Sequence, residues 1–180
     1  LKNSSPTAII NWFEKNPPLG GLGKIKLAEA LLEQGRNAEV EKLIKDGWTT
    51  AEIRKNDLGY YRAKFKKFLT SEDHLKRADY LAWEKKYWDL KRMLKYLPTD
   101  ERALYNARQI LMSNSYGVDN AIAKVPDHLK SNTGLEFDRL RWRNRRGRLE
   151  GSLEILYKNA NRTERQMIRP DLWWEQRKSV

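Results

Sequence analysis

Residues 133–158, TGLEFDRLRWRNRRGRLEGSLEILYK, decide the fold of this chain. In the first half, apolar residues recur at the i, i+3 and i+7 spacing of a helix and occupy two opposed faces. One face carries Phe137 and Leu140, and the other carries Leu135 and Trp142. A helix that is apolar on two opposed faces has packing neighbours on both sides.

The second half of this stretch predicts a partner helix. Gly147 marks a turn, and leucines then recur at helical spacing from Leu149 to Leu156. Two such helices form an antiparallel hairpin, and a hairpin packed on both sides is the unit of a stacked helical array. The arginines between the apolar stripes add a cationic seam, which comprises Arg139, Arg141, Arg143, Arg145 and Arg146.

The rest of the chain repeats this design, with no sustained alternation of strand period. Thr49-Thr50 is expected to cap a segment that ends at Leu69 and is divided at Gly59. A last helix is expected to begin at Arg169-Pro170. Other helices are expected over residues 6–15, 24–34, 37–45, 71–85, 88–96, 99–113 and 118–124, with turns at Gly35, Gly47, Pro98, Gly117, Pro126 and Gly147.

These patterns predict an all-α fold of about ten helices. We expect the antiparallel hairpins to stack into a right-handed superhelix, as in a tetratricopeptide-like solenoid. Residues 1–180 are expected to form a single domain. Within it, residues 1–21 contribute an N-terminal helix and a Pro/Gly loop, and residues 22–180 contribute the hairpin array.

Composition indicates a folded, basic chain. It holds seven Trp, eight Tyr and four Phe, whereas disordered chains lack aromatic residues. The formal net charge of +12 suits an anionic partner, such as nucleic acid, anionic lipid or a polymer with carboxylates, or else serves solubility alone. No apolar run approaches the ~20 residues of a membrane span. The absence of Cys excludes a disulfide framework and a thiolate metal site.

Catalytic and metal chemistry find little support in the sequence. His74 and His128 are the only histidines, and both are interpreted as surface residues without a ligand role. No serine has a histidine at a suggestive spacing. The acidic pairs at 72–73 and 100–101 follow Ser71 and Thr99, where they suit a helix N-terminus better than acid/base catalysis. We therefore expect no catalytic residue, no metal site and no cofactor.

The arginine seam is open to two interpretations. It could bind nucleic-acid phosphates, with the aromatic stripe at 80, 83 and 87 stacking on bases. Alternatively, some arginines pair with acids: Asp138 and Glu150 lie at helical pairing distance from Arg141 and Arg146. The predicted substrate-binding residues are then Arg139, Arg143 and Arg145. The predicted structural aromatic residues are Trp83, Trp142, Trp173 and Trp174.

Several segments carry a family resemblance through their order and spacing. Residues 77–94 read RADYLAWEKKYWDLKRML, a Leu-Trp helix followed by Arg-Met-Leu. The later segments are Leu97-Pro98, the Ala-rich helix 103–111, Gly117-Val118-Asp119, Val125-Pro126, the arginine-rich hairpin 135–156 and PDLWWEQR at 170–177. In this arrangement the chain resembles the soluble lytic murein transglycosylases, best from Arg77 onward.

The resemblance implies a ring of helical hairpins, called the U-shaped domain, which a linker joins to a catalytic domain similar to goose-type lysozyme. The family cleaves the MurNAc–GlcNAc bond of peptidoglycan and leaves a 1,6-anhydro sugar, using a catalytic Glu followed by Ser. This chain contains no Glu-Ser dipeptide. It opens with Leu1 and stops where the catalytic half would follow, so we expect a fragment that is not itself catalytic.

The expected role is therefore that of a periplasmic scaffold or ring that admits peptidoglycan. Its expected partners are peptidoglycan and the missing catalytic domain of the same parent chain, and the chain is expected to be a monomer. No specific nucleic acid and no membrane span are expected. The alternative is a helical-repeat module that binds nucleic acid or another protein.

Overall fold

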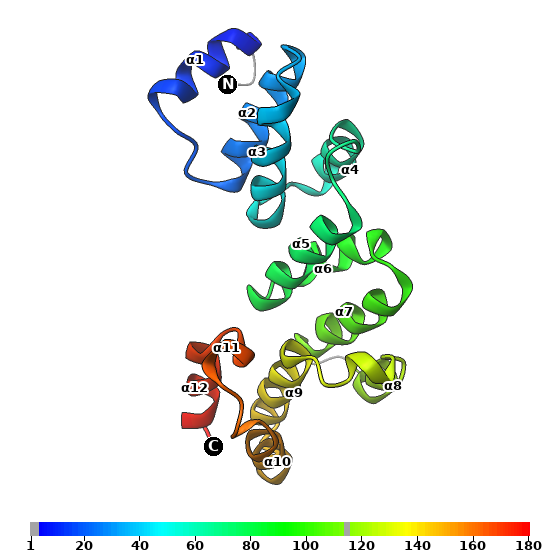
Figure 1. The fold of residues 1–180 in the computed structure, drawn as a ribbon. Helices are drawn as coiled ribbons and strands as arrows, with labels where there is room; N and C mark the ends of the chain where they lie inside the picture. The colour runs from blue at the N-terminus through cyan, green and yellow to red at the C-terminus, as the bar shows by residue number, and fades with distance from the viewer. Residues whose placement is uncertain (1–3, 114–115) are drawn as a thin grey trace. The chain divides into compact units, whose positions relative to one another are not determined.

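The computed structural model describes residues 4–113 and 116–180 (Figure 1). In these ranges the chain forms twelve α-helices and two short 3-10 helices, and it has no strand. The all-α prediction is thus confirmed. The chain divides into two compact units: residues 1–84 with 95–97, and residues 85–94 with 98–180. No helix in the described ranges is long and apolar enough to cross a membrane.

The first unit consists of five helices whose starts follow local capping rules. Pro6 occupies the first turn of α1, where the Ser5 side chain accepts a hydrogen bond from the Ala8 backbone N–H. A capping box between Thr70 and Asp73 begins α5. The helices are α1 (Pro6–Lys15), α2 (Gly21–Glu33), α3 (Asn37–Thr50), α4 (Lys55–Lys64) and α5 (Ser71–Trp83).

Gly47 was predicted to end a helix, and this prediction is wrong. Gly47 is buried inside α3, where that helix packs closely against α2. A Cβ added at Gly47 would lie 2.8 Å from the carbonyl oxygen of Gly21, and one added at Gly21 would lie 2.5 Å from the backbone nitrogen of Ala51. The two glycines therefore allow two backbones to approach, a tertiary role that local turn statistics do not reveal.

Two further boundaries differ from the prediction. Thr49-Thr50 closes α3 instead of capping the next helix, which begins at Lys55. Gly59 does not divide the following segment, because α4 continues through it to Lys64. A glycine inside a helix costs only about 1 kcal/mol relative to alanine, which the packing of Leu58 and Tyr61 can offset.

Trp48 is the centre of the core in this unit. It is fully buried, and the buried Arg77 donates to the carbonyl oxygens of Trp48 and Ala51 at 2.5 and 2.9 Å. His74 lies against the Trp48 ring at 5.6 Å and is 8% exposed. The expectation of a surface histidine is thus wrong. Burial, aided by the positive charge of Arg62, lowers the pKa of His74, so it favours the neutral form.

The second unit is organised around α9 (Thr133–Arg145), as residues 133–158 suggested. This helix packs against α7, α10 and α12. Every residue from Thr133 to Trp142 except Arg139 is buried, which confirms that α9 has neighbours on opposed faces. The chain turns at Gly147, whose φ of 63° is a left-handed value that glycine adopts readily. The other helices are α6 (Tyr87–Met93), α7 (Thr99–Leu111), α8 (Val118–Ala123), α10 (Leu149–Asn159), α11 (Glu164–Met167) and α12 (Pro170–Lys178).

The four tryptophans predicted to be structural do not share one environment. Trp83, Trp142 and Trp173 are 6%, 8% and 3% exposed. Trp174 differs, because 56% of it is exposed. Adjacent helical residues point about 100° apart, so α12 can direct only one of Trp173 and Trp174 into the core.

We predict that Trp142→Ala lowers the free energy of unfolding of the second unit by about 3–5 kcal/mol, because it removes a buried indole between packed helices. Urea denaturation followed by circular dichroism measures this change. The matched control is Trp88→Ala in the same unit, where the side chain is 63% exposed and the expected change is within about 0.5 kcal/mol. Equal stability of the two variants would contradict the packing role of Trp142.

Candidate functional site

The centre of the arginine seam is a buried ion network. Asp138 is fully buried and accepts hydrogen bonds from two arginines, Arg108 of α7 and Arg141 of its own helix. The distances are 2.8 Å from Arg108 Nε and 3.1 Å from Arg141 Nη2. Burial lowers the pKa of Arg141, although Asp138 opposes that shift. The predicted pairing of Asp138 with Arg141 is therefore present, and its role is structural.

The three arginines predicted to bind substrate have different surroundings. Arg143 crosses the hairpin to α10, where it donates to the Gly151 carbonyl and pairs with Glu154 at 3.0 Å. Arg145 Nη2 donates to the carbonyl oxygen of Leu111 at 2.7 Å. Arg139 is half-buried, and it has no hydrogen bond or ion pair from its side chain within the described ranges. The structure thus uses Arg143 and Arg145 for tertiary contacts.

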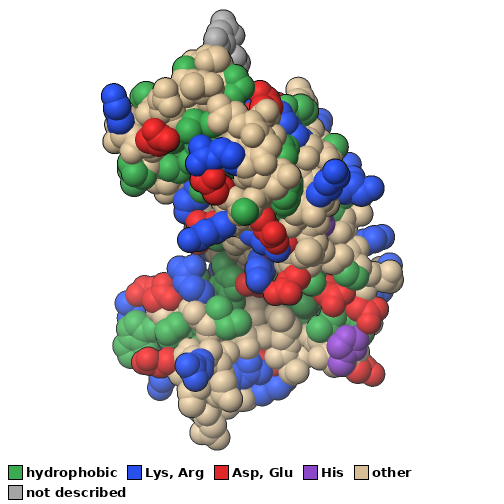
Figure 2. All heavy atoms as spheres, turned by 45° about the horizontal axis from the view of Figure 1, so that its top comes forward, with side chains coloured by type: hydrophobic (Ala, Val, Ile, Leu, Met, Phe, Trp, Pro, Cys, Tyr) green, Lys and Arg blue, Asp and Glu red, His purple; other side chains and the backbone are tan. Residues whose placement is uncertain are grey.

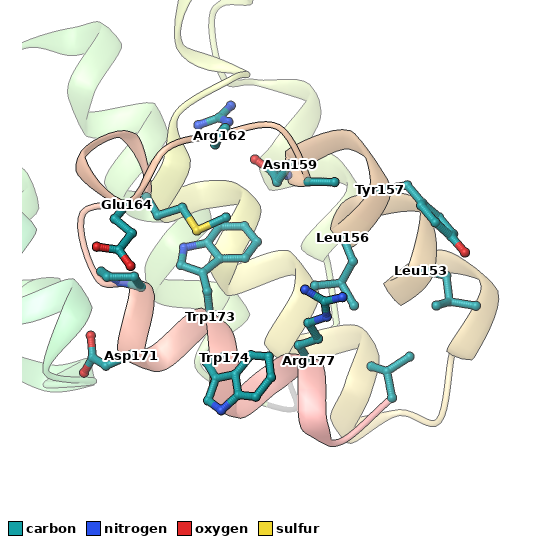
Figure 3. Close-up of a pocket in the computed structure, with 14 residues that line it drawn as sticks. Leu153, Leu156, Tyr157, Asn159, Arg162, Glu164, Asp171, Trp173, Trp174 and Arg177 are labelled. Atoms are coloured by element: carbon teal, nitrogen blue, oxygen red, sulfur yellow. The ribbon is translucent and has the colours of Figure 1, made fainter.

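A cleft in the second unit is the stronger candidate for a functional site. It lies among α10, α11 and α12 and has a volume of about 770 Å³, within the range of small-ligand pockets (Figure 3). Its walls are mostly apolar and aromatic, with a few polar side chains. The lining residues are Leu153, Leu156, Tyr157, Asn159, Ala160, Arg162, Glu164, Met167, Pro170, Asp171, Trp173, Trp174, Arg177 and Val180.

The helices around the cleft are positioned by α9 and by two local turns. Both α10 and α12 pack on α9, and Trp173 anchors α12 through a ring contact with Phe137 at 5.5 Å. A capping box between Thr163 and Gln166 forms the short helix α11. The chain then turns at Ile168, whose φ of 63° is unfavourable for a β-branched residue. Pro170 in the first turn of α12 restarts the helix.

Several charged groups near the cleft are already paired. Glu136 is 1% exposed and binds two cations, Lys158 at 2.5 Å and Arg162 at 3.0 Å. Arg162 also donates to Thr133 Oγ1 and to the carbonyl oxygen of Ser131. Asp171 pairs with Arg169 at 3.2 Å. Hydrogen bonding from that arginine lowers the pKa of Asp171.

Two charged groups of the lining remain available for a ligand. In the part of the chain that the structure describes, neither Glu164 nor Arg177 has a side-chain hydrogen bond or ion pair. The Arg177 guanidinium lies over the Trp174 ring at 5.8 Å. This cation–π contact leaves the guanidinium N–H groups able to donate hydrogen bonds to a ligand. Trp174 and Tyr157 add exposed aromatic surface, with exposed fractions of 56% and 75%.

Asp171 does not have the protonation behaviour of a glycosidase acid. A glycosidase needs a carboxylic acid whose pKa is raised so that it can donate a proton. Asp171 in the cleft has a lowered pKa. Within the described ranges, no cluster of three or more His, Cys, Asp or Glu side chains could hold a metal ion. The cleft therefore offers apolar surface and two separated charges.

Sequence reasoning missed this cleft. Its lining comes from three helices separated by turns, and no motif spans them. One signal was present in the adjacent Trp173-Trp174 pair, because neighbouring helical residues point about 100° apart and so face different surroundings. The exposed member of that pair lies at the cleft.

No family profile matches the chain, and neither does any curated protein or solved structure.

We predict that Asp138→Asn destabilises the second unit by about 3–5 kcal/mol, because it leaves two buried guanidiniums without the carboxylate between them. Chemical denaturation of the purified variant measures the loss. The control is Asp171→Asn, which removes an exposed ion pair and is expected to leave the denaturation midpoint unchanged. If Asp138→Asn kept full stability, the network would not hold α7 to α9.

Proposed function

We propose that this chain is a non-catalytic helical scaffold that binds peptidoglycan, as part of a soluble lytic murein transglycosylase in the periplasm. The observation that carries the proposal is the cleft of α10, α11 and α12, which offers apolar surface and unpaired charges to a ligand. The parent enzyme's catalytic domain would perform the cleavage.

The helical architecture supports this proposal. Helices α2 and α3 pack together, as do α9 and α10, and helical hairpins are the units of the U-shaped domain in that family. Helix α9 is apolar on two faces, as expected for the interior of a stacked array. We propose that the hairpins continue into the right-handed superhelix that the sequence suggested.

The charge of the chain supports an anionic polymer as the ligand. Peptidoglycan carries carboxylates on its stem peptides, and the chain has a net charge of +12. Figure 2 shows Lys and Arg side chains spread among Asp and Glu over the face that it draws, with no single continuous basic patch. A dispersed charge attracts a polyanion without defining a precise site, so the cleft is proposed to supply the local contact.

We predict that the purified chain is retained on peptidoglycan sacculi but releases no anhydro-muropeptides, because it contains no Glu-Ser dipeptide of the kind that the family uses for cleavage. Sedimentation of sacculi with bound protein measures retention, and chromatography of the supernatant measures release. An inactive cationic protein of similar mass and charge serves as the control for simple ion exchange. If sacculi retained no more of this chain than of the control protein, the proposed function would be contradicted. Release of anhydro-muropeptides above a buffer blank would show that the chain is catalytic.

The rival function is nucleic-acid binding, and it makes a different prediction. A dispersed charge gives weak, non-specific RNA or DNA binding that disappears near physiological salt. We therefore expect no submicromolar affinity for any RNA or DNA sequence in filter-binding titrations near 150 mM salt. Tight binding with a sequence preference would favour the rival over the peptidoglycan proposal.

A further inference from the structure

The unpaired charges of the cleft have opposite signs and lie apart. Figure 3 shows Glu164 and Asp171 on one side of the Trp173 indole and Arg177 on the other, toward Leu156 and Leu153. Asp171 is paired with Arg169, whereas Glu164 and Arg177 have no side-chain ion-pair partner in the described ranges. The cleft therefore has an acidic end and a cationic end, separated by apolar surface.

Most of the remaining lining is aliphatic and aromatic. It includes Leu153, Leu156, Met167 and Trp173, which suit methyl and methylene groups. A volume of about 770 Å³ is enough for a few amino-acid residues. A ligand that matches the cleft must therefore carry an ammonium and a carboxylate at a distance from each other, with apolar groups between them.

A bare sugar chain fits this surface poorly. Its hydroxyls need hydrogen-bonding partners when they leave water, and each unmatched hydroxyl costs free energy. The polar groups of the wall are largely engaged already. The Asn159 amide nitrogen donates to the Ile155 carbonyl at 2.8 Å, and the Arg162 guanidinium is held by Glu136, Thr133 and Ser131. Apart from the charged Glu164 and Arg177, few polar atoms of the wall lack a hydrogen bond in the described ranges, and they include Asn159 Oδ1 and the Tyr157 hydroxyl.

From this charge arrangement we propose that the cleft binds the peptide stems of peptidoglycan, and not its glycan strand. Arg177 binds a carboxylate of the stem peptide, with Trp174 holding the guanidinium in place. Glu164 binds an ammonium group of the same peptide, and the aliphatic groups between the two charges contact Trp173. The inference rests on the proposed function, because it names the part of peptidoglycan that this site recognises.

The test uses the full 180-residue chain and the tripeptide L-alanyl-γ-D-glutamyl-meso-diaminopimelate. Indole N–H resonances in NMR titrations report binding at Trp173 and Trp174, once assigned with Trp→Phe variants. Three comparison ligands are titrated in parallel: the same tripeptide with acetylated amines, the same tripeptide with amidated carboxylates, and chitotetraose, which has sugars alone. Sacculus retention is measured separately on the same protein samples.

We expect the unmodified tripeptide to shift the Trp174 signal and both blocked peptides to bind about tenfold more weakly, as loss of one charge-assisted contact predicts. Arg177→Gln is expected to weaken tripeptide binding by the same factor. The matched control is Arg165→Gln, which removes an equally exposed positive charge on α11 outside the lining and is expected to leave binding unchanged.

Three outcomes would overturn the inference. Chitotetraose binding with no response to the tripeptide would assign the cleft to sugars. If Arg177→Gln and Arg165→Gln weakened tripeptide binding equally, the loss would reflect the net charge of the chain and not a contact made by Arg177. Retention on sacculi with no response of Trp174 to any of the four ligands would place peptidoglycan binding elsewhere on the chain, so that the proposed function would stand without this site.

Discussion

The second unit depends on one buried carboxylate that two arginines share. Asp138 forms buried ion pairs with Arg108 of α7 and Arg141 of α9. A buried charged side chain is tolerated only when an opposite charge pairs with it. Gly134 belongs to the same constraint, because a Cβ there would overlap the Arg108 guanidinium. The network therefore fixes α7 against α9, and α9 in turn positions α10 and α12 around the cleft.

This constraint also explains why much of the cationic seam is engaged in contacts within the fold. Arginines on a helix with two packed faces lie close to neighbouring helices, so their long side chains reach carbonyl groups and carboxylates there. Arg143 and Arg145 do so, through Gly151, Glu154 and Leu111. At the cleft, by contrast, Glu164 of α11 and Arg177 of α12 have no side-chain hydrogen bond or ion pair in the described ranges, and both helices are packed on fewer sides.

Much of the fold could be predicted from the sequence, because helical periodicity and capping are local properties. The two faces of α9, the turn at Gly147 and the helix starts at Pro6 and Pro170 follow from a few residues each. The predictions for Gly47 and His74 were wrong because residues far away in the sequence determine the surroundings of these two side chains. Gly47 meets Gly21 of another helix, and His74 is buried against Trp48, so neither environment can be inferred from neighbouring residues.

The sequence by itself determined the helical class, the two-sided packing of residues 133–142, the pairing of Asp138 with Arg141 and the basic charge, since each depends on composition or on spacing within one helix. Only the tertiary structure decided that Arg108 shares Asp138, that Trp174 faces outward while Trp173 is buried, and that Glu164 and Arg177 line one cleft. The physical reason is that these relations depend on how separate helices pack, and packing is set by contacts between residues far apart in the chain.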